Sequence, residues 1–520
     1  MITHMSCDDL TALMTSDSLF AVFDVRERGE FNQGQIPNVT SLPRSQIEFR
    51  IAELVPNREV PIALYDEGGE RARLAADTLV RLGYESVSVL TGGLTEWRRE
   101  GRAIVSGVNV PSKAFGEKVH HESDVPDISP EELKDLLDGS IKPIIVDVRT
   151  PEEYGRFCIP GGSNIPGGDL ILWAEELRQK PTVIVNCAGR TRSIIGTAAL
   201  RRLGLTNVRA LRNGTMGWVL AGFELETKPG RQTPAAPPAG REAAMALALR
   251  IAEEEDIPTI SPRQVLNVMA DSNAGVTYFI DVRSEHEYEA GHMAGSINVP
   301  GGQAVQRADD FVAVRNARII FISNQSSRAV IAAYWYRQMG FPNVYVLQGG
   351  LDAWTESGAK LIGGAPVNEP LGIQAANETV RYIDSEALNR RITDSSVLVL
   401  DVGTSLDCEA AHVPGAKWIS RGWLEIRIPP HISDRDQPIV VTCSDGRQST
   451  FAARTLTEID YADVSVLDGG VRAWSAAGLP TQNGLEACLV EPNDVVLSPS
   501  VRGNKEDMQR YLDWELKLQK

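Results

Sequence analysis

One pattern is written four times along this chain of 520 residues, and it constrains the fold more than any other feature. In each copy an apolar run ends in Asp-Val, and a glycine turn followed by a tryptophan comes 71 to 73 residues after the aspartate. The aspartates and tryptophans are Asp24 and Trp97, Asp147 and Trp218, Asp281 and Trp354, and Asp401 and Trp474. Four nearly equal intervals predict four tandem copies of one domain.

Each copy alternates strand patterns with helical patterns. β-branched runs such as 183–186 lead into polar loops, and amphipathic segments follow these loops. Ser129 and Pro130 are typical of the start of a helix, with serine as the N-cap and proline at the first helical position. This alternation predicts an α/β fold in which every domain has a parallel sheet with helices on both faces. We expect Asp147 and Arg149, like their counterparts, to form an ion pair at a strand end that fixes the following segment, and a role in shaping the pocket is the alternative.

The stretches between copies predict the domain limits. Residues 105–126 form a polar connector, and a proline- and alanine-rich connector at 228–240 precedes a predicted helix at Glu242–Glu254. We expect the second connector to divide a first pair of domains from a second pair, and the helical segment after Asn504 to pack on another domain. The predicted units are domain 1 at 1–110, domain 2 at 125–228, the linker and helix at 229–256, domain 3 at 257–362, domain 4 at 379–484, and a helical extension at 485–520.

A fixed interval of 31 residues before each tryptophan marks a loop that follows a strand-like run. The loop begins with Asp66, Cys187, Ser323 and Cys443 in copies one to four, so only two copies carry a thiol. Ser193 and Ser449 follow these cysteines by six residues. We expect each hydroxyl to cap the following helix or to bond to the sulfur.

Cys187 is the strongest candidate for a reactive group. It lies where a strand hands over to a helix, and at such a place free backbone N–H groups and the helix dipole favour negative charge. Arg190 and Arg192 add two positive charges to the same loop. We therefore expect the thiolate, which is the attacking species in cysteine chemistry, to be favoured over the thiol, and an anion to bind beside it.

Composition excludes several classes of protein. Six cysteines without a CxxC pair form neither a disulfide framework nor a zinc site, so free thiols are expected. A formal net charge of −17 argues against nucleic acid or an anionic membrane as a partner. No apolar run is long enough to span a bilayer, and the first residues lack the features of a signal peptide, so a cytoplasmic location is expected.

Four ordered motifs together resemble the rhodanese, or thiosulfate sulfurtransferase, family. They are Asp-Val-Arg, the segment 285–300 that begins Glu-His-Glu-Tyr, the cysteine loop, and Gly-Gly followed by Trp four residues after the second glycine. The resemblance covers almost the whole chain, and it implies four rhodanese-like domains. It also implies that the loop cysteine carries sulfane sulfur as a persulfide.

The activity implied by the resemblance is a double displacement. Cys187 attacks the outer sulfur of thiosulfate or of another persulfide donor, and cyanide or a thiol then takes the sulfur away. No metal or organic cofactor is needed for this cycle. The implied substrate-binding residues belong to the two cysteine loops: Ala188, Gly189, Arg190, Thr191, Arg192 and Ser193, and Ser444, Gly446, Arg447 and Ser449.

Copy four departs from the pattern. It introduces Asp445, places its arginine one position early at Arg447, and has Gly403 where the other copies have arginine after Asp-Val. An acid in the loop would oppose thiolate formation and repel an anionic donor. Cys187 is therefore the first candidate for the catalytic residue, and Cys443 is the second.

Asp66 and Ser323 cannot form a persulfide, so we expect copies one and three to be inactive supports. A non-catalytic scaffold or sensor that binds protein partners is accordingly one alternative function. An enzyme like an arsenate reductase or a related protein phosphatase is another, although four residues rather than five separate Cys187 from Arg192, which favours a smaller pocket suited to sulfur. The sequence leaves a monomer and a homodimer both open.

Two histidines and one further cysteine are also candidates for a catalytic role. His292 and His412 occupy the position held by Gln35 and Cys158 in the other copies, and such free variation favours a turn or packing role over that of a general base. Cys158 leaves a second interpretation open, in which it resolves a persulfide on Cys187 as a disulfide.

Overall fold

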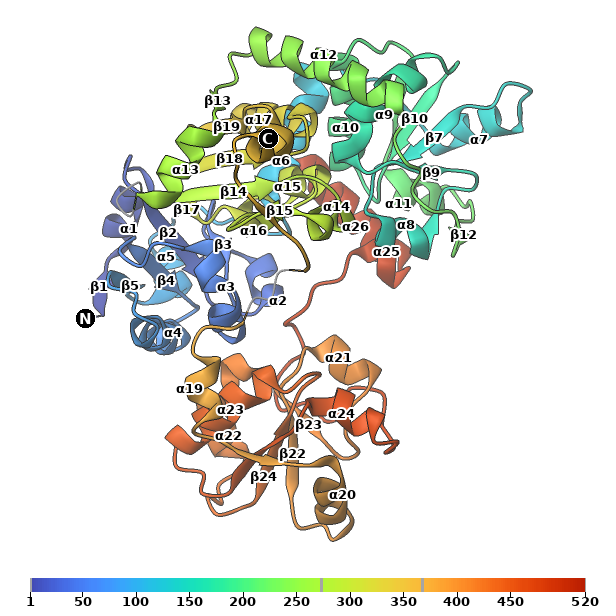
Figure 1. The fold of residues 1–520 in the computed structure, drawn as a ribbon. Coiled ribbons are helices and arrows are strands. Elements are labelled where there is room, and N and C mark those ends of the chain that lie inside the picture. Colours follow the sequence, from blue (N-terminus) through green and yellow to red (C-terminus); the bar gives the residue numbers. More distant parts are fainter. Residues whose placement is uncertain (1, 272–274, 366–368, 520) are drawn as a thin grey trace. The chain divides into compact units, whose positions relative to one another are not determined.

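Four α/β domains follow one another in the computed structural model, which describes residues 2–271, 275–365 and 369–519 (Figure 1). Within each domain five strands form one sheet, and their order across the sheet is first, fifth, fourth, second and third along the chain. Neighbouring strands in these four sheets run parallel. Helices flank the sheets, and the predicted fold class is confirmed.

Domains 1 and 4 belong to one compact unit. Domain 1 contains β1 (Thr3–Met5), α1 (Cys7–Met14), β2 (Phe20–Asp24), α2 (Arg28–Gln33), β3 (Thr40–Ser41), α3 (Ile47–Leu54), β4 (Ile62–Tyr65), α4 (Glu70–Arg81), β5 (Val87–Leu90) and α5 (Gly93–Arg99). Domain 4 contains α19 (Ile373–Asn377), β21 (Arg381–Ile383), α20 (Ser385–Thr393), β22 (Leu398–Asp401), α21 (Ser405–Ala410), β23 (Lys417–Trp418), α22 (Leu424–His431), β24 (Ile439–Thr442), α23 (Arg447–Glu458), β25 (Val464–Leu467) and α24 (Gly470–Ala476).

Domains 2 and 3 form the other compact unit together with the C-terminal helices. Domain 2 contains β6 (Asp127–Ile128), α7 (Pro130–Asp138), β7 (Ile144–Asp147), α8 (Pro151–Arg156), β9 (Ser163–Asn164), α9 (Leu170–Arg178), β10 (Val183–Asn186), α10 (Thr191–Arg202), β11 (Val208–Leu211) and α11 (Gly214–Leu220). Domain 3 contains β13 (Thr259–Ile260), α13 (Pro262–Ala270), β14 (Thr277–Asp281), α14 (Glu285–Ala290), β16 (Ile297–Asn298), α15 (Gly301–Gln306), β18 (Arg318–Ile322), α17 (Ser327–Gln338), β19 (Val344–Leu347) and α18 (Gly350–Glu356).

The expected division at the 228–240 connector is therefore wrong. The helix that follows it, α12 (Pro238–Glu254), packs against α9 of domain 2 and α17 of domain 3 and so joins the two domains. Small residues on its buried face allow close packing, and a Cβ at Gly240 would lie 2.1 Å from the carbonyl oxygen of Leu172. Periodicity predicts this helix but not its two partners.

Two helices outside the repeats also pack onto domain 2. The 105–126 connector, which has a polar composition, contains α6 (Val110–Glu122), and this helix contacts α10. The C-terminal segment forms α25 (Pro499–Arg502) and α26 (Lys505–Leu516), with the side chain of Asn504 capping α26 as its N-cap. Because α26 packs on α11, the prediction that the extension covers another domain is confirmed.

Local helix signals are also confirmed. The side chain of Ser129 accepts a hydrogen bond from the backbone N–H of Glu132, and the Glu132 carboxylate accepts one from the backbone N–H of Ser129. Pro130 stands at the first helical position of α7.

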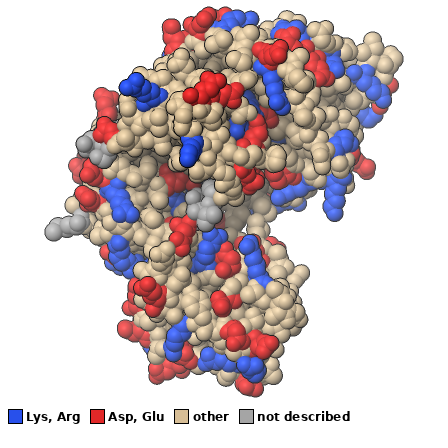
Figure 2. Space-filling model, viewed as in Figure 1, with Lys and Arg blue, Asp and Glu red and all other residues tan. Residues whose placement is uncertain are grey.

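Acidic and basic side chains are interspersed over the face drawn in Figure 2. Within the described ranges, none of the helices combines the length and apolarity that crossing a bilayer demands.

Candidate active site

Cys187 directly follows β10, a central strand of the domain 2 sheet, and α10 begins four residues later. The loop is held from the other side by the start of α11, where Thr215 and Met216 donate backbone hydrogen bonds to the carbonyl oxygens of Cys187 and Ala188. Gly214 permits this approach, since its φ is +53° and a Cβ there would lie 2.2 Å from the Cys187 oxygen. The loop is therefore fixed by its strand, by its helix and by the glycine turn.

The same close approach explains the glycine and tryptophan repeat. A Cβ on the glycine that starts the equivalent helix would lie 2.1 to 2.4 Å from a loop carbonyl oxygen in the other three domains. These glycines are Gly93, Gly350 and Gly470, and the tryptophans that follow them are buried. A constant interval between loop and tryptophan is thus a packing requirement of each domain, whether or not the loop carries cysteine.

The serine expected beside each cysteine is confirmed. The Sγ of Cys187 lies 3.6 Å from the Oγ of Ser193, which donates a hydrogen bond of 2.8 Å to the carbonyl oxygen of Arg190. In domain 4 the Sγ of Cys443 lies 3.4 Å from both Oγ and the backbone nitrogen of Ser449. Each serine therefore links its sulfur to the first turn of the following helix.

The expected activation of the Cys187 thiol is wrong. Burial raises its pKa above the ordinary thiol value, although Arg192 and the bonds with Ser193 act in the opposite direction. Its side chain is only 2% exposed, so the cost of removing a thiolate from water exceeds the stabilisation that the nearby cation provides. This balance favours the thiol over the thiolate at Cys187.

Both loop arginines are held by glutamates. Arg190 donates to both carboxylate oxygens of Glu117 on α6, at 2.5 and 2.8 Å. Arg192 donates to both oxygens of Glu153 on α8, at 2.6 and 2.8 Å. Burial alone would raise the pKa of Glu153, but Arg192 lowers it to about 2, so this partner is ionised.

The Arg192 pair recurs in domains that lack the cysteine. Arg71 bonds to Glu30 in domain 1 at 2.6 and 2.7 Å, and Arg328 bonds to Glu287 in domain 3 at 2.6 and 2.8 Å. This ion pair is therefore a feature of the fold rather than of the reactive loop. Comparing the four copies in the sequence could have found it, because a glutamate stands six residues after the strand-end aspartate in the three copies that have this arginine.

The strand-end ion pair predicted for Asp147 and Arg149 is also confirmed. The guanidinium of Arg149 donates to the carboxylate of Asp147, with a shortest distance of 2.7 Å, and to the carbonyl oxygen of Phe157 at 2.5 Å. It thereby ties the segment after β7 to the sheet. Domain 4 lacks this arginine, and burial raises the pKa of its Asp401 to about 7.

The Cys443 loop is more open than the Cys187 loop. Its Arg447 is exposed and bonds to Asp445, with a shortest distance of 2.7 Å, rather than approaching the sulfur. Gly446 adopts a left-handed conformation with φ +92°, whereas Arg190 at the same position of domain 2 does not. Burial raises the pKa of the Cys443 thiol, and the charge of Asp445 acts in the same direction, as predicted.

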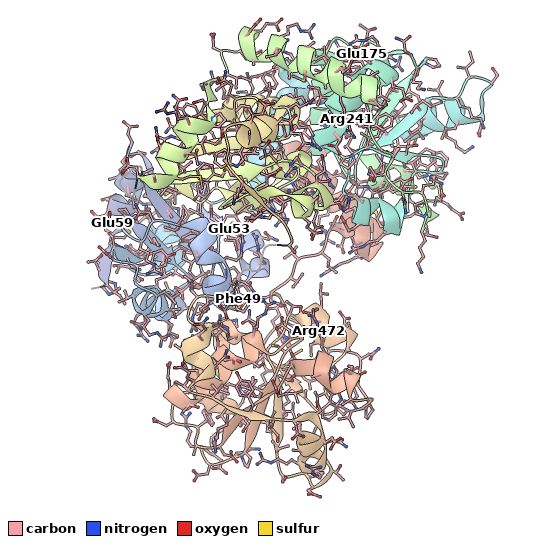
Figure 3. The ribbon with its side chains drawn as sticks, viewed as in Figure 1. Phe49, Glu53, Glu59, Glu175, Arg241 and Arg472 are labelled. Atoms are coloured by element: carbon pink, nitrogen blue, oxygen red, sulfur yellow. The ribbon has the colours of Figure 1, made fainter. Side chains whose placement is uncertain are left out.

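Domain 1 borders the Cys443 loop. Phe49 of α3 meets Phe451 of α23 edge to face, with ring centroids 5.9 Å apart, and the Arg447 guanidinium lies 5.9 Å from the Phe49 ring. Figure 3 labels Phe49 at the place where these two domains meet. The backbone N–H of Arg472, also labelled there, donates to the carbonyl oxygen of Ser444 at 3.1 Å.

In domains 1 and 3 the loop satisfies its own polar groups. The carboxylate of Asp66 accepts hydrogen bonds from the backbone N–H groups of Gly69 and, at 2.7 Å, Arg71. In domain 3, Ser323 accepts one bond of 3.3 Å from the N–H of Ala329. The carboxylate in domain 1 therefore occupies the place where backbone donors could otherwise hold an anion.

The histidines have structural partners, as expected. Nδ1 of His292 lies 2.8 Å from the carbonyl oxygen of Tyr288, whose ring stacks on the imidazole, and Nδ1 of His412 has an equivalent bond to Cys408. All six cysteines are free thiols. Burial and Glu226 raise the pKa of Cys158 to about 11. A thiol with so high a pKa forms little thiolate, so a role for Cys158 in resolving a persulfide on Cys187 is disfavoured.

One group of residues near Cys187 lies outside the sequence prediction. The hydroxyl of Thr191 donates to Glu515 of α26 at 2.6 Å, and Gly116 of α6 lies so close to Thr191 that a Cβ there would be 2.8 Å from its methyl carbon. The two helices cover the loop. Glu515 lies beyond the fourth copy, so comparison between repeats gives no signal for it.

These features define a protein of four tandem α/β domains, each with a parallel sheet. Two of the domains carry a cysteine loop after a central strand. The model of the rhodanese-like domain matches residues 6–100, 129–221, 261–357 and 384–477, and the chain belongs to the rhodanese family. It is similar to a crystal structure of thiosulfate sulfurtransferase from Pseudomonas aeruginosa, with 37% identity and a TM-score of 0.92 over 99% of this chain and 97% of that one.

Single-domain relatives match part of the chain. A sulfurtransferase of Allochromatium vinosum is 31% identical over 106 residues, which are 20% of this chain and 97% of the relative. The thiosulfate sulfurtransferase GlpE of Pseudoalteromonas translucida is 34% identical over 102 residues, which are 19% of this chain and 85% of the relative. Each of these relatives thus corresponds to one of the four domains in size.

Proposed function

We propose that this protein is a sulfurtransferase that carries sulfane sulfur as a persulfide on Cys187, with Cys443 as a second carrier. The observation that supports this most directly is the place of Cys187 at the carboxyl end of a central strand, with the Ser193 hydroxyl 3.6 Å from its sulfur. Membership of the rhodanese family and the similarity to named sulfurtransferases support the same reaction.

The reaction proceeds in two displacements. The Cys187 thiolate attacks the outer sulfur of thiosulfate or of a thiol persulfide, a new S–S bond forms, and sulfite or the thiolate leaves with the electron pair of the broken bond. Cyanide or a thiol then attacks the outer sulfur of the persulfide, and Cys187 leaves as the thiolate. Arg192 favours the thiolate at both stages, since its charge opposes the effect of burial on the Cys187 pKa.

Domains 1 and 3 act as non-catalytic supports in this proposal. Their loops carry Asp66 and Ser323, and the Asp66 carboxylate already uses the backbone donors of its loop. This observation favours a scaffold role for these two domains but not for the whole chain.

Steady-state sulfur transfer to cyanide tests the proposal. Cys187→Ala should remove most of the activity, Cys443→Ala should remove a smaller part, and Cys488→Ser should leave it unchanged as a control at a half-buried thiol outside both loops. Full activity in the double variant Cys187→Ala and Cys443→Ala would contradict it.

A further inference from the structure

The C-terminal helix α26 lies over the Cys187 loop, although nothing in the repeated domain pattern places a helix there. Met508 and Leu512 of α26 are buried against Met216, whose backbone bonds to the loop. Figure 1 shows α26 in red, and it contacts α11 and α6 of the same unit. The loop residues 188–191 are buried as a result of this cover.

Glu515 is the acidic residue that α26 contributes to the cover. Its side chain is almost fully buried, and Oε1 accepts the hydrogen bond from Thr191. Oε2 is buried and has no hydrogen-bond partner within the described parts of the chain. A Cβ at Gly189 would lie 3.3 Å from Oε2, so this oxygen faces the loop backbone between Cys187 and Arg190.

Two cations act on Glu515, since the charges of Lys113 and Arg190 both lower its pKa. Arg190 is held by Glu117 and Arg192 by Glu153. The ammonium of Lys113 on α6 lies 4.6 and 4.8 Å from the rings of Tyr511 and Trp514 on α26.

The protonation of Glu515 responds to charge nearby. Burial raises the pKa of Glu515, whereas Lys113 and the bond from Thr191 lower it. When Glu515 is ionised, a donor with two negative charges must either approach this carboxylate or force it to take up a proton. Both oppose binding of such a donor at this loop.

We infer that Glu515 is a specificity-determining residue of the Cys187 site, which selects against dianionic sulfur donors and favours thiol persulfides with at most one negative charge near the transferred sulfur. This inference rests on the proposed function and deepens it, because it assigns a donor class to Cys187. Thiosulfate is then a poor donor for this cysteine in the intact protein.

Donor charge can be varied while the chemistry is kept. The Cys187 thiolate attacks the outer sulfur of thiosulfate and releases sulfite, or attacks the outer sulfur of methanethiosulfonate and releases methanesulfinate. In both reactions one S–S bond forms, one breaks, and the leaving group takes the electron pair, so neither needs another reactant. Thiosulfate carries two negative charges and methanethiosulfonate carries one.

The experiment compares single-turnover loading of Cys187 by these two donors, followed by mass spectrometry of the Cys187 peptide. The variants are Glu515→Gln, which keeps an oxygen that can accept from Thr191, and Asp513→Asn, which removes an exposed charge from the same helix. We expect Glu515→Gln to raise the ratio of the thiosulfate rate to the methanethiosulfonate rate about tenfold. Asp513→Asn should leave the ratio unchanged.

Three results would overturn the inference. Unchanged rates with both donors in Glu515→Gln show that the carboxyl group does not select by charge, and equal acceleration with both donors shows that the variant only loosens α26. Either result leaves sulfur loading of Cys187 intact, so the proposed function survives. Absence of sulfur on Cys187 with both donors in every variant would remove the proposed function and this inference together.

Discussion

Arg192 donates from both terminal nitrogens to the carboxylate of Glu153, at 2.6 and 2.8 Å, and this pairing limits what the arginine can do for Cys187. The negative charge of Glu153 weakens the effect of the Arg192 charge at the sulfur. Glu153→Gln should leave the positive charge of Arg192 uncompensated and lower the pKa of the Cys187 thiol. We expect alkylation of Cys187 by iodoacetamide at neutral pH to become about three- to tenfold faster.

The matched control for that prediction is Glu152→Gln, which removes an exposed charge from the same helix. Glutamine at position 153 can still accept the backbone bond from Thr150 that caps α8. An alkylation rate equal to that of the control, in a folded protein, would show that Arg192 does not act on the sulfur.

Asp66 should be a stabilising residue of domain 1. Asp66→Ala leaves the half-buried N–H group of Gly69 and the buried N–H group of Arg71 without their acceptor, and we expect the free energy of unfolding to fall by roughly 1–3 kcal/mol. Ser323→Ala in domain 3 should cost less, because only one bond of 3.3 Å is lost. Denaturant melts measure the difference, and hydrogen exchange across 66–72 localises it.

Unchanged exchange protection in Asp66→Ala would mean that the carboxylate does not hold the loop. Domain 1 would then keep its loop shape through the glycine turn alone, where Leu94 donates to the Asp66 carbonyl oxygen at 2.8 Å.

Asp401 should make the stability of domain 4 depend on pH. Burial without an arginine partner raises its pKa from 3.8 to about 7, so the folded state favours the neutral acid. The unfolded chain ionises first as pH rises, and stability is lost progressively between these two values, by on the order of 4 kcal/mol above pH 7. Asp401→Asn should therefore stabilise the domain at and above neutral pH, with an advantage that shrinks as pH falls toward 3.8.

Thermal melts over this pH range measure that advantage, with Glu409→Gln as a control at an exposed carboxylate on the neighbouring helix α21. An advantage of Asp401→Asn that does not change with pH would show that the titration of Asp401 is not its cause.

The repeat explains why so much of the fold could be predicted from the sequence. A glycine that must approach a loop carbonyl oxygen, such as Gly214, and a strand-end pair such as Asp147 and Arg149 are needed in every copy, so their spacing is visible without any structure. The contacts that each domain makes with its neighbours leave no such repeated spacing in the sequence. The connector before α12 has the composition of a spacer, yet Gly240 and the small residues after it make α12 a packing helix.

The site was predicted only in part for a similar reason. The position of Cys187 and its hydroxyl partner, Ser193, follow from the local pattern. The protonation of the Cys187 thiol depends instead on burial, to which two helices distant in the sequence contribute. Glu117 and Glu515 come from those helices, α6 and α26, and no local motif links them to the loop. Local charges favour a thiolate, whereas the tertiary cover favours the thiol.

The central claim is that Cys187 carries the transferred sulfur, and mass spectrometry of the protein after treatment with a sulfane sulfur donor tests it most directly. The account predicts that the peptide containing Cys187 gains the mass of one sulfur atom, and that cyanide removes it with formation of one equivalent of thiocyanate. Sulfur transfer at the full rate while Cys187 stays unmodified would contradict the account.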